Sequence, residues 1–133
     1  MEMKKLILTF IVFLMAVQNV WADSTVFVSR WYEALRTVNR PTFERLLSDK
    51  ATIDLRELGV IQNKEEFIES LDYWEDVAGD LLISTNIVSS TDTKIVVDVC
   101  YRFPSEPFTN RETFYLGSGL IERQEQEKIR DDC

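Results

Sequence analysis

The absence of histidine limits the chemistry available to this chain. Its 133 residues include 23 Asp and Glu, 15 Lys and Arg, two Cys and no His. Without an imidazole, the Ser-His-Asp and Cys-His arrangements that activate a nucleophile are excluded, and two thiols are too few for a four-thiolate zinc site. Carboxylate, tyrosine or lysine chemistry remains, or no chemistry at all, and we expect neither a metal nor a cofactor.

Aromatic side chains are the residues that would suit a flat, apolar ligand. The candidates for ligand binding are Trp31, Tyr73, Trp74, Tyr101 and Tyr115. The alternative is that they fill the core, which is the more frequent role of aromatic residues at core spacing.

The charge narrows the range of partners. With a formal net charge of −8, the surface repels phosphate backbones and anionic lipid, so we expect no nucleic-acid partner and no membrane-surface binding. An acidic run, Asp72, Glu75, Asp76 and Asp80, is interpreted as a solvated face, because calcium needs a shaped, oxygen-rich loop.

The N-terminus has the three-part pattern of a secretory signal. Lys4 and Lys5 precede an apolar run over residues 6–17, and Val20-Trp21-Ala22 offers small residues at the two positions that a signal peptidase recognises. We therefore expect residues 1–22 to be removed and the mature chain to be periplasmic or secreted from a bacterium. The alternative is an uncleaved membrane anchor, but so short a run spans only ~18 Å as a helix, against ~30 Å of hydrocarbon.

The segments that must position the candidate residues show helical spacing first and strand spacing later. Apolar periodicity and capping residues predict helices over residues 24–38, 41–47 and 63–79. β-branched residues between turn signals predict the strands. These are residues 51–55, 83–88, 94–103, 111–116 and 120–128. The order is that of a single α+β domain over residues 23–133.

The glycines near the C-terminus belong to a turn. Gly117-Ser118-Gly119 is interpreted as a hairpin turn, because a dinucleotide-binding fingerprint needs a third glycine and a following helix. The strand after this turn carries charges and glutamines on both faces over residues 121–129. We expect it to lie at an exposed end of the sheet.

Three stretches of the mature chain resemble a known group of proteins. They are Val28-Ser-Arg-Trp-Tyr-Glu-Ala-Leu35, Phe43-Glu-Arg-Leu-Leu-Ser-Asp-Lys-Ala-Thr-Ile53, and Lys64-Glu-Glu-Phe-Ile68 after a loop with Gly59. Together they resemble the SnoaL-like group of the nuclear transport factor two-like superfamily, whose fold ketosteroid isomerases share. The resemblance implies a cystatin-like cone, in which a strongly curved antiparallel sheet wraps against a long helix and an apolar pocket opens at one end. Members use that pocket for isomerisation, dehydration, cyclisation or epoxide opening, so the fold does not settle the function.

The resemblance also implies places for an isomerase's catalytic groups. Trp31 stands where the donor tyrosine of the first helix belongs, with Tyr32 about 100° round the helix. Leu55 stands where the carboxylate base belongs, and Asp54, one residue earlier, faces the other side of a strand. Glu112 falls near the place of the acid donor.

The candidate catalytic residues are therefore Asp54, Glu112 and Tyr32, and the two carboxylates have simpler alternatives. Asp54 fits a solvated or cap-bonded carboxylate, and Glu112 fits a cross-strand partner of Arg or Lys. For Asp54, the catalytic interpretation would require a buried carboxylate with a raised pKa.

The two cysteines predict a disulfide between Cys100 and Cys133. A pair of cysteines in an exported protein usually forms a bond, and the resemblance supplies no catalytic role for either thiol. The alternatives are a buried free thiol at Cys100 and a bond from Cys133 to a second chain.

Three hypotheses for the function follow. The first is an exported, non-catalytic protein whose cone holds a small apolar ligand or packs against a partner. The second is an isomerase or dehydratase that acts through Asp54 or Glu112 with a tyrosine. The third is an assembly module that forms a homodimer through the open face of the sheet. A carboxylate and a hydroxyl that both point into one accessible cavity would favour the enzyme.

Overall fold

The computed structural model describes residues 23–133. Residues 1–22, on which the predictions of a signal or an anchor fall, lie outside the described residues. A helix over residues 23–37, here called the N-terminal helix, is followed by two helices and a six-stranded sheet. The further elements are α2 (Arg40–Leu46), β1 (Leu47–Leu55), η1 (Arg56–Leu58), β2 (Val60–Asn63), α3 (Lys64–Ala78), β3 (Leu82–Ser90), β4 (Lys94–Arg102), β5 (Phe108–Gly117) and β6 (Leu120–Arg130). The predicted α+β class is confirmed.

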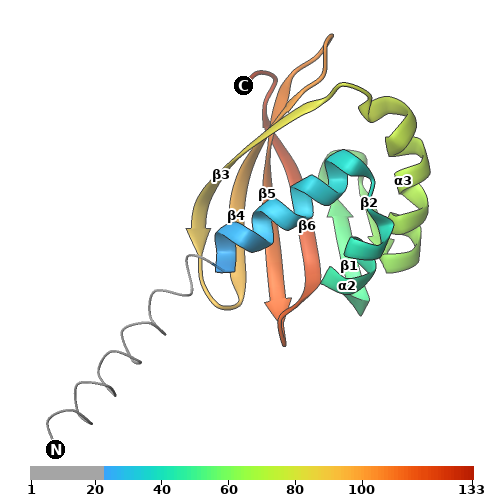
Figure 1. The fold of residues 1–133 in the computed structure, drawn as a ribbon. Coiled ribbons are helices and arrows are strands. Elements are labelled where there is room, and N and C mark those ends of the chain that lie inside the picture. The colour runs from blue at the N-terminus through green and yellow to red at the C-terminus, as the bar shows by residue number, and fades with distance from the viewer. Residues whose placement is uncertain (1–22) are drawn as a thin grey trace, which may run out of the picture.

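The sheet is curved, and the helices lie on one side of it (Figure 1). Its strand order is β2-β1-β6-β5-β4-β3. Neighbouring strands are antiparallel except β1 and β6, which run parallel. The order corrects one expectation: β6 lies inside the sheet between β1 and β5, and its residue Gln124 is fully buried.

The capping residues fix where the helices begin. Asn39 caps α2 by accepting a hydrogen bond from the backbone N–H of Thr42. The predicted capping box of α3 is present, because Asn63 and Glu66 each bond the other's backbone N–H. Strand β2 was not predicted. It is a four-residue edge strand that is mostly exposed, so no alternation of apolar and polar residues marks it.

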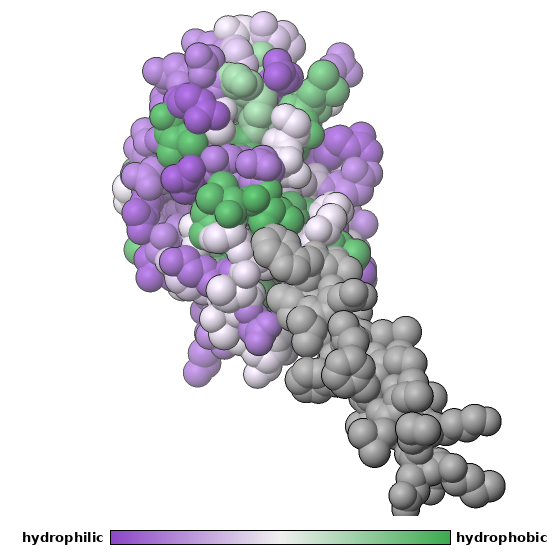
Figure 2. All heavy atoms as spheres, turned by 90° about the vertical axis from the view of Figure 1, so that its left-hand side faces the viewer, coloured by the Kyte–Doolittle hydropathy of each residue, from purple (hydrophilic) through white to green (hydrophobic). Residues whose placement is uncertain are grey.

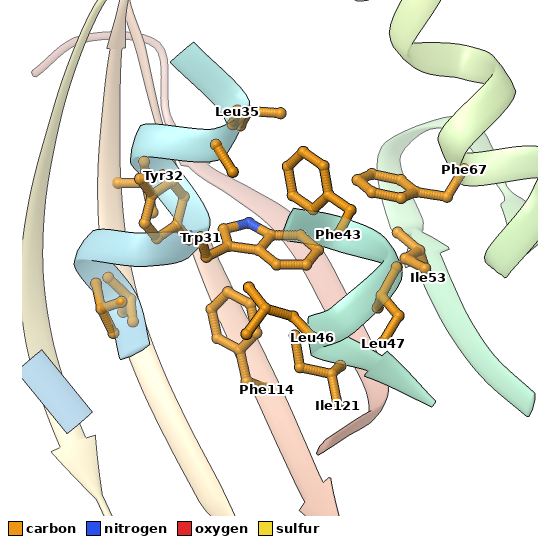
Figure 3. Packing of buried hydrophobic residues seen from close by; sticks show 14 of the residues in the cluster. Trp31, Tyr32, Leu35, Phe43, Leu46, Leu47, Ile53, Phe67, Phe114 and Ile121 are labelled. Atoms are coloured by element: carbon orange, nitrogen blue, oxygen red, sulfur yellow. The ribbon is translucent and has the colours of Figure 1, made fainter. Parts of the chain in front are cut away.

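Trp31 holds the helices to the sheet. It is 1% exposed, and its ring packs against Phe43 of α2, Phe67 of α3 and Phe114 of β5 with centroids 4.8, 5.5 and 5.3 Å away (Figure 3). Its Nε1 has no hydrogen-bond partner among the described residues, so its role is packing. This core joins the N-terminal helix, α2 and α3 to β5.

The surface on the β3 side is largely hydrophilic, with a few hydrophobic residues gathered near its middle (Figure 2). Strand β3 is the outer strand of the sheet there, and it exposes Leu82 and Val88. Among the described residues, no helix is long and apolar enough to cross a membrane.

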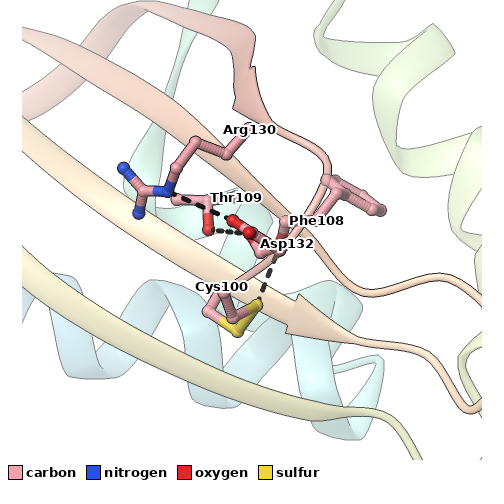
Figure 4. Close-up of a disulfide and its surroundings, with 6 residues drawn as sticks. Cys100, Phe108, Thr109, Arg130 and Asp132 are labelled. Carbon is pink, nitrogen blue, oxygen red and sulfur yellow. Dashed lines mark hydrogen bonds and ion pairs between the residues drawn. A yellow bond between two sulfur atoms is a disulfide. The ribbon is translucent and has the colours of Figure 1, made fainter.

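Cys100 and Cys133 form a disulfide, as predicted, with their Cα atoms 5.6 Å apart (Figure 4). Cys100 lies between the buried residues Val99 and Tyr101 of β4, so the bond lies on the sheet face that points away from the helices. Thr109 of β5 donates a hydrogen bond to the carbonyl of Asp132 at 2.7 Å. Together the two contacts fasten the C-terminal tail across β4 and β5.

We predict that replacing both cysteines by serine lowers the free energy of unfolding by roughly 3.8 kcal/mol, because the bond closes a loop between residues 33 apart in sequence. Urea denaturation of the parent and of the double variant measures the difference. Dithiothreitol should lower the free energy of unfolding of the parent by the same amount and leave that of the variant unchanged. Equal midpoints for oxidised parent and variant would contradict the prediction.

Candidate functional site

Two adjoining hollows meet at η1, whose residue Leu58 lines both. The inner cavity, about 350 Å³, lies between α3 and strands β4 to β6, and the outer hollow, about 360 Å³, continues it toward the surface. Both are lined by Leu55, Leu58, Phe108, Asn110 and Gln126. The shared wall makes them one site with an inner and an outer part.

Among the described residues that line the inner cavity, none is charged. Its apolar wall consists of Leu35, Leu55, Leu58, Phe67, Leu71, Trp74 and Phe108, and its polar groups come from Gln62, Ser70, Tyr73, Tyr101, Asn110 and Gln126. The outer hollow, in contrast, is lined by three charged side chains, Glu57, Glu106 and Lys128. In an acidic protein, the uncharged lining of the inner cavity suits a neutral and mainly apolar molecule.

Glu112 of β5 lies behind this cavity and is the centre of a buried hydrogen-bond network. The side chain is 0% exposed. Its Oε1 accepts from the Tyr32 hydroxyl at 2.7 Å and from Gln124 Nε2 at 3.1 Å. Its Oε2 accepts from the Tyr101 hydroxyl at 2.6 Å and from Asn110 Nδ2 at 3.2 Å. Both oxygens are therefore paired, and all four donors are neutral.

The pKa of Glu112 is raised from its ordinary value. Burial raises the pKa because it penalises the charged form, and the four hydrogen bonds lower it by a smaller amount. Burial and the neighbouring carboxylate also raise the pKa values of Tyr32 and Tyr101 well above the ordinary range, so both remain hydroxyl donors. Asn110 and Gln124 bond the carboxyl through N–H groups, which can only donate, so both carboxyl oxygens are acceptors in these bonds.

The structure brings together some of the aromatic candidates and separates others. Tyr73, Trp74 and Tyr101 line the inner cavity, and Trp74 Nε1 donates to the carbonyl of Leu35 at 2.8 Å. Trp31 belongs to the closed core and does not line the cavity. Tyr115 does not line it either, and its ring lies between Lys94 and Arg123, with the cations 5.6 and 5.8 Å from the ring centroid.

The carboxylate candidates differ in where they point. Asp54 does not line the cavity, and its carboxylate lies 3.5 Å from Arg123 and 3.9 Å from Arg56. Leu55, next along β1, lines the cavity in its place. Tyr32 and Glu112 bond each other within the network. Among the described lining of the inner cavity there is therefore no carboxylate to act as a base.

Sequence reasoning missed three residues of the site, Asn110, Gln124 and Gln126. Asn110 and Glu112 are two apart in β5, and Gln124 and Gln126 are two apart in β6, so each pair faces one side of the sheet. Phe108 and Phe114 extend the inward-facing row in β5, and this period-two pattern was the available signal. No group of residues suited to a metal ion occurs in the described part of the chain.

Comparison with known proteins identifies the fold. No protein-family model and no curated protein matches the chain. An NTF2-like protein of unknown function from Burkholderia xenovorans aligns with a TM-score of 0.68 at 8% identity, over 84% of this chain and 86% of that one. A protein from Kribbella flavida proposed to be a ketosteroid isomerase gives 0.67 at 13% identity, over 80% and 78%. IdmH from Streptomyces antibioticus, proposed to be a polyketide cyclase, gives 0.66 at 16% identity, over 79% and 91%.

These similarities show that the chain has the cone fold of NTF2-like and SnoaL-like proteins, which confirms at the level of the fold the resemblance noted in the sequence. At these identities the likeness extends to the fold and not to an activity. The function must therefore be argued from the cavity and the network behind it.

The raised pKa of Glu112 gives a pH-dependent prediction. A group whose pKa is higher in the folded than in the unfolded chain stabilises the fold at pH values below its unfolded pKa, about 4.3 for Glu. This stabilisation is lost as the pH rises through the pKa of the folded chain. The parent should therefore lose stability relative to Glu112→Gln as the pH rises from about 4. Urea denaturation of both proteins across this range measures the difference.

The exposed Glu122 of β6 supplies the control, since Glu122→Gln removes one negative charge without touching the network. A relative stability of the parent that increases with pH would mean that the folded protein lowers the pKa of Glu112, contrary to the prediction.

Proposed function

We propose that this protein binds a small, neutral and mainly apolar molecule in the inner cavity and does not transform it. The observation that carries the proposal is the uncharged lining, in a chain whose formal net charge is −8. The cavity volume of about 350 Å³ suits a molecule of a few fused rings or a short branched chain.

The network supports binding rather than acid-base catalysis. A base must reach a proton of its substrate within hydrogen-bond distance or through one water. Glu112 has both oxygens paired and does not line the cavity, and Asp54 pairs with arginines on the other face of β1. An isomerase or dehydratase would need one of these carboxylates to turn into the cavity.

The sheet face that points away from the helices is occupied by ion pairs within the chain, which argues against an assembly module that uses this face. Arg111 bonds Asp98 through two nitrogens at 2.9 and 3.0 Å. Glu125 accepts from Arg56 at 2.9 Å and from Arg123 at 2.6 Å. Covering such charges with a second copy would remove their hydration.

We also propose that residues 1–22 are a secretory signal and that the domain of residues 23–133 is exported. The lysine-led apolar run and the Ala22 site support the signal. The disulfide supports an oxidising compartment.

Binding predicts a specific effect of Leu58, which is 72% exposed and lines both hollows. Leu58→Asp should weaken binding of the neutral fluorescent probe N-phenyl-1-naphthylamine by about fivefold or more, because it removes apolar contact and places a charge against the ligand. A fluorescence titration gives the dissociation constants. Leu82→Asp is the matched control, since Leu82 is 65% exposed and lines neither hollow. Equal binding by the two variants, or no binding by the parent, would overturn the proposal.

Export predicts that protein recovered from the periplasm or the medium begins at Asp23. Mass spectrometry of the intact chain measures this directly. Ala22→Trp should leave the precursor unprocessed, because a bulky residue blocks the position next to the cleavage site. A full-length parent chain in the membrane fraction would show instead that the apolar run is an anchor.

A further inference from the structure

One polar wall of the inner cavity is formed by three side chains that belong to the Glu112 network. Tyr101, Asn110 and Gln126 all line the cavity. Tyr101 and Asn110 bond Glu112 directly. Gln126 is linked to Glu112 through Gln124, whose Nε2 donates to Glu112 and whose Oε1 accepts from Gln126 Nε2 at 2.9 Å.

A carboxylate can only accept hydrogen bonds, and this determines which atoms the network leaves for a ligand. The Tyr101 hydroxyl gives its one hydrogen to Glu112, so its oxygen can only accept a further bond. Asn110 and Gln126 each use one N–H within the network. Each amide keeps its second N–H, and among the described residues neither Asn110 Oδ1 nor Gln126 Oε1 accepts a hydrogen bond.

This side of the cavity therefore offers three oxygens that accept and two N–H groups that donate. A hydroxyl group can use both kinds, since it donates one hydrogen bond and accepts others. A ketone or an ether can use only the N–H groups. A carboxylate would bring a second negative charge close to buried Glu112, where little water screens the repulsion.

We propose that the inner cavity selects apolar molecules that carry a neutral hydroxyl group, and that this hydroxyl donates to Gln126 Oε1. Gln126 is the acceptor for two reasons. Its amide nitrogen donates to Gln124, which leaves its amide oxygen free, and its side chain lines both hollows. Glu112 is a positioning residue, which orients the wall without touching the ligand. The inference rests on the proposed binding function and deepens it.

Three probes with the same naphthalene ring test the selection. Isothermal titration of the parent at neutral pH should show 2-naphthol binding about fivefold more tightly than 2-methoxynaphthalene, the effect of about one net hydrogen bond. 2-Naphthoate should bind more weakly than either. Equal affinities for the naphthol and its methyl ether would overturn the selection, and tightest binding of the naphthoate would overturn it as well.

Two variants with the same substitution test the acceptor. Gln126→Met should bring the ratio of the two dissociation constants close to one. Gln62→Met should keep the parent's ratio, because Gln62 lines the same cavity from β2 and takes no part in the network. An unchanged ratio in Gln126→Met overturns the assignment.

Glu112→Gln tests the positioning role, because its amide can no longer accept four bonds and the orientation of the wall is lost. If circular dichroism shows that the variant folds, the ratio of the two dissociation constants should fall at least twofold. An unchanged ratio would overturn the positioning role. If it does not fold, the comparison of Gln126→Met with Gln62→Met decides. Failure of both 2-naphthol and 2-methoxynaphthalene to bind the parent would refute the binding function itself, whereas equal binding refutes only the selection.

Discussion

A buried carboxylate with no cation among its partners in the described part of the chain is the constraint on which this structure depends. Removing a charged group from water costs several kcal/mol unless hydrogen bonds replace the hydration. Glu112 receives them from the N-terminal helix, from β4, from its own strand and from β6, through Tyr32, Tyr101, Asn110 and Gln124. Since each donor comes within 3.2 Å of the carboxylate, the helix and three neighbouring strands must keep their relative positions. The same bonds that satisfy the charge therefore fix the shape of the cone.

The network separates the charge from the cavity by one layer of side chains. Tyr101 and Asn110 bond Glu112 and also line the cavity, so the cavity wall presents a tyrosine and an amide there instead of a carboxylate. On β1 the alternation of side chains has a similar result, since Leu55 faces the cavity and Asp54 pairs with Arg123 on the other side. The carboxylates of Glu112 and Asp54 are each next to cavity residues, but neither lines the cavity. This arrangement supports the proposal of a binding site rather than a site for proton transfer.

Local patterns in the sequence were sufficient for the helices, the hairpin turn and the opposite orientations of Asp54 and Leu55, because these depend on residues a few positions apart. They were not sufficient for the network, since Tyr32 and Glu112 are 80 residues apart and no local period links them. They also misplaced β6, where glutamines and charges on both faces suggested an exposed strand. Gln124 is a buried polar residue whose side chain donates a hydrogen bond to Glu112 within the core. The sequence of a single strand does not show whether a polar residue has a buried hydrogen-bond partner or faces water.

The central claim is that Glu112 accepts hydrogen bonds from four neutral donors and donates none. Infrared spectroscopy of protein with isotope-labelled glutamate, as the difference between the parent and Glu112→Gln, reports the ionisation of this one side chain. The account predicts the paired stretching bands of a carboxylate ion at neutral pH. The carbonyl band of a protonated carboxylic acid at the same pH would contradict it, because one carboxyl oxygen would then have to donate a hydrogen bond.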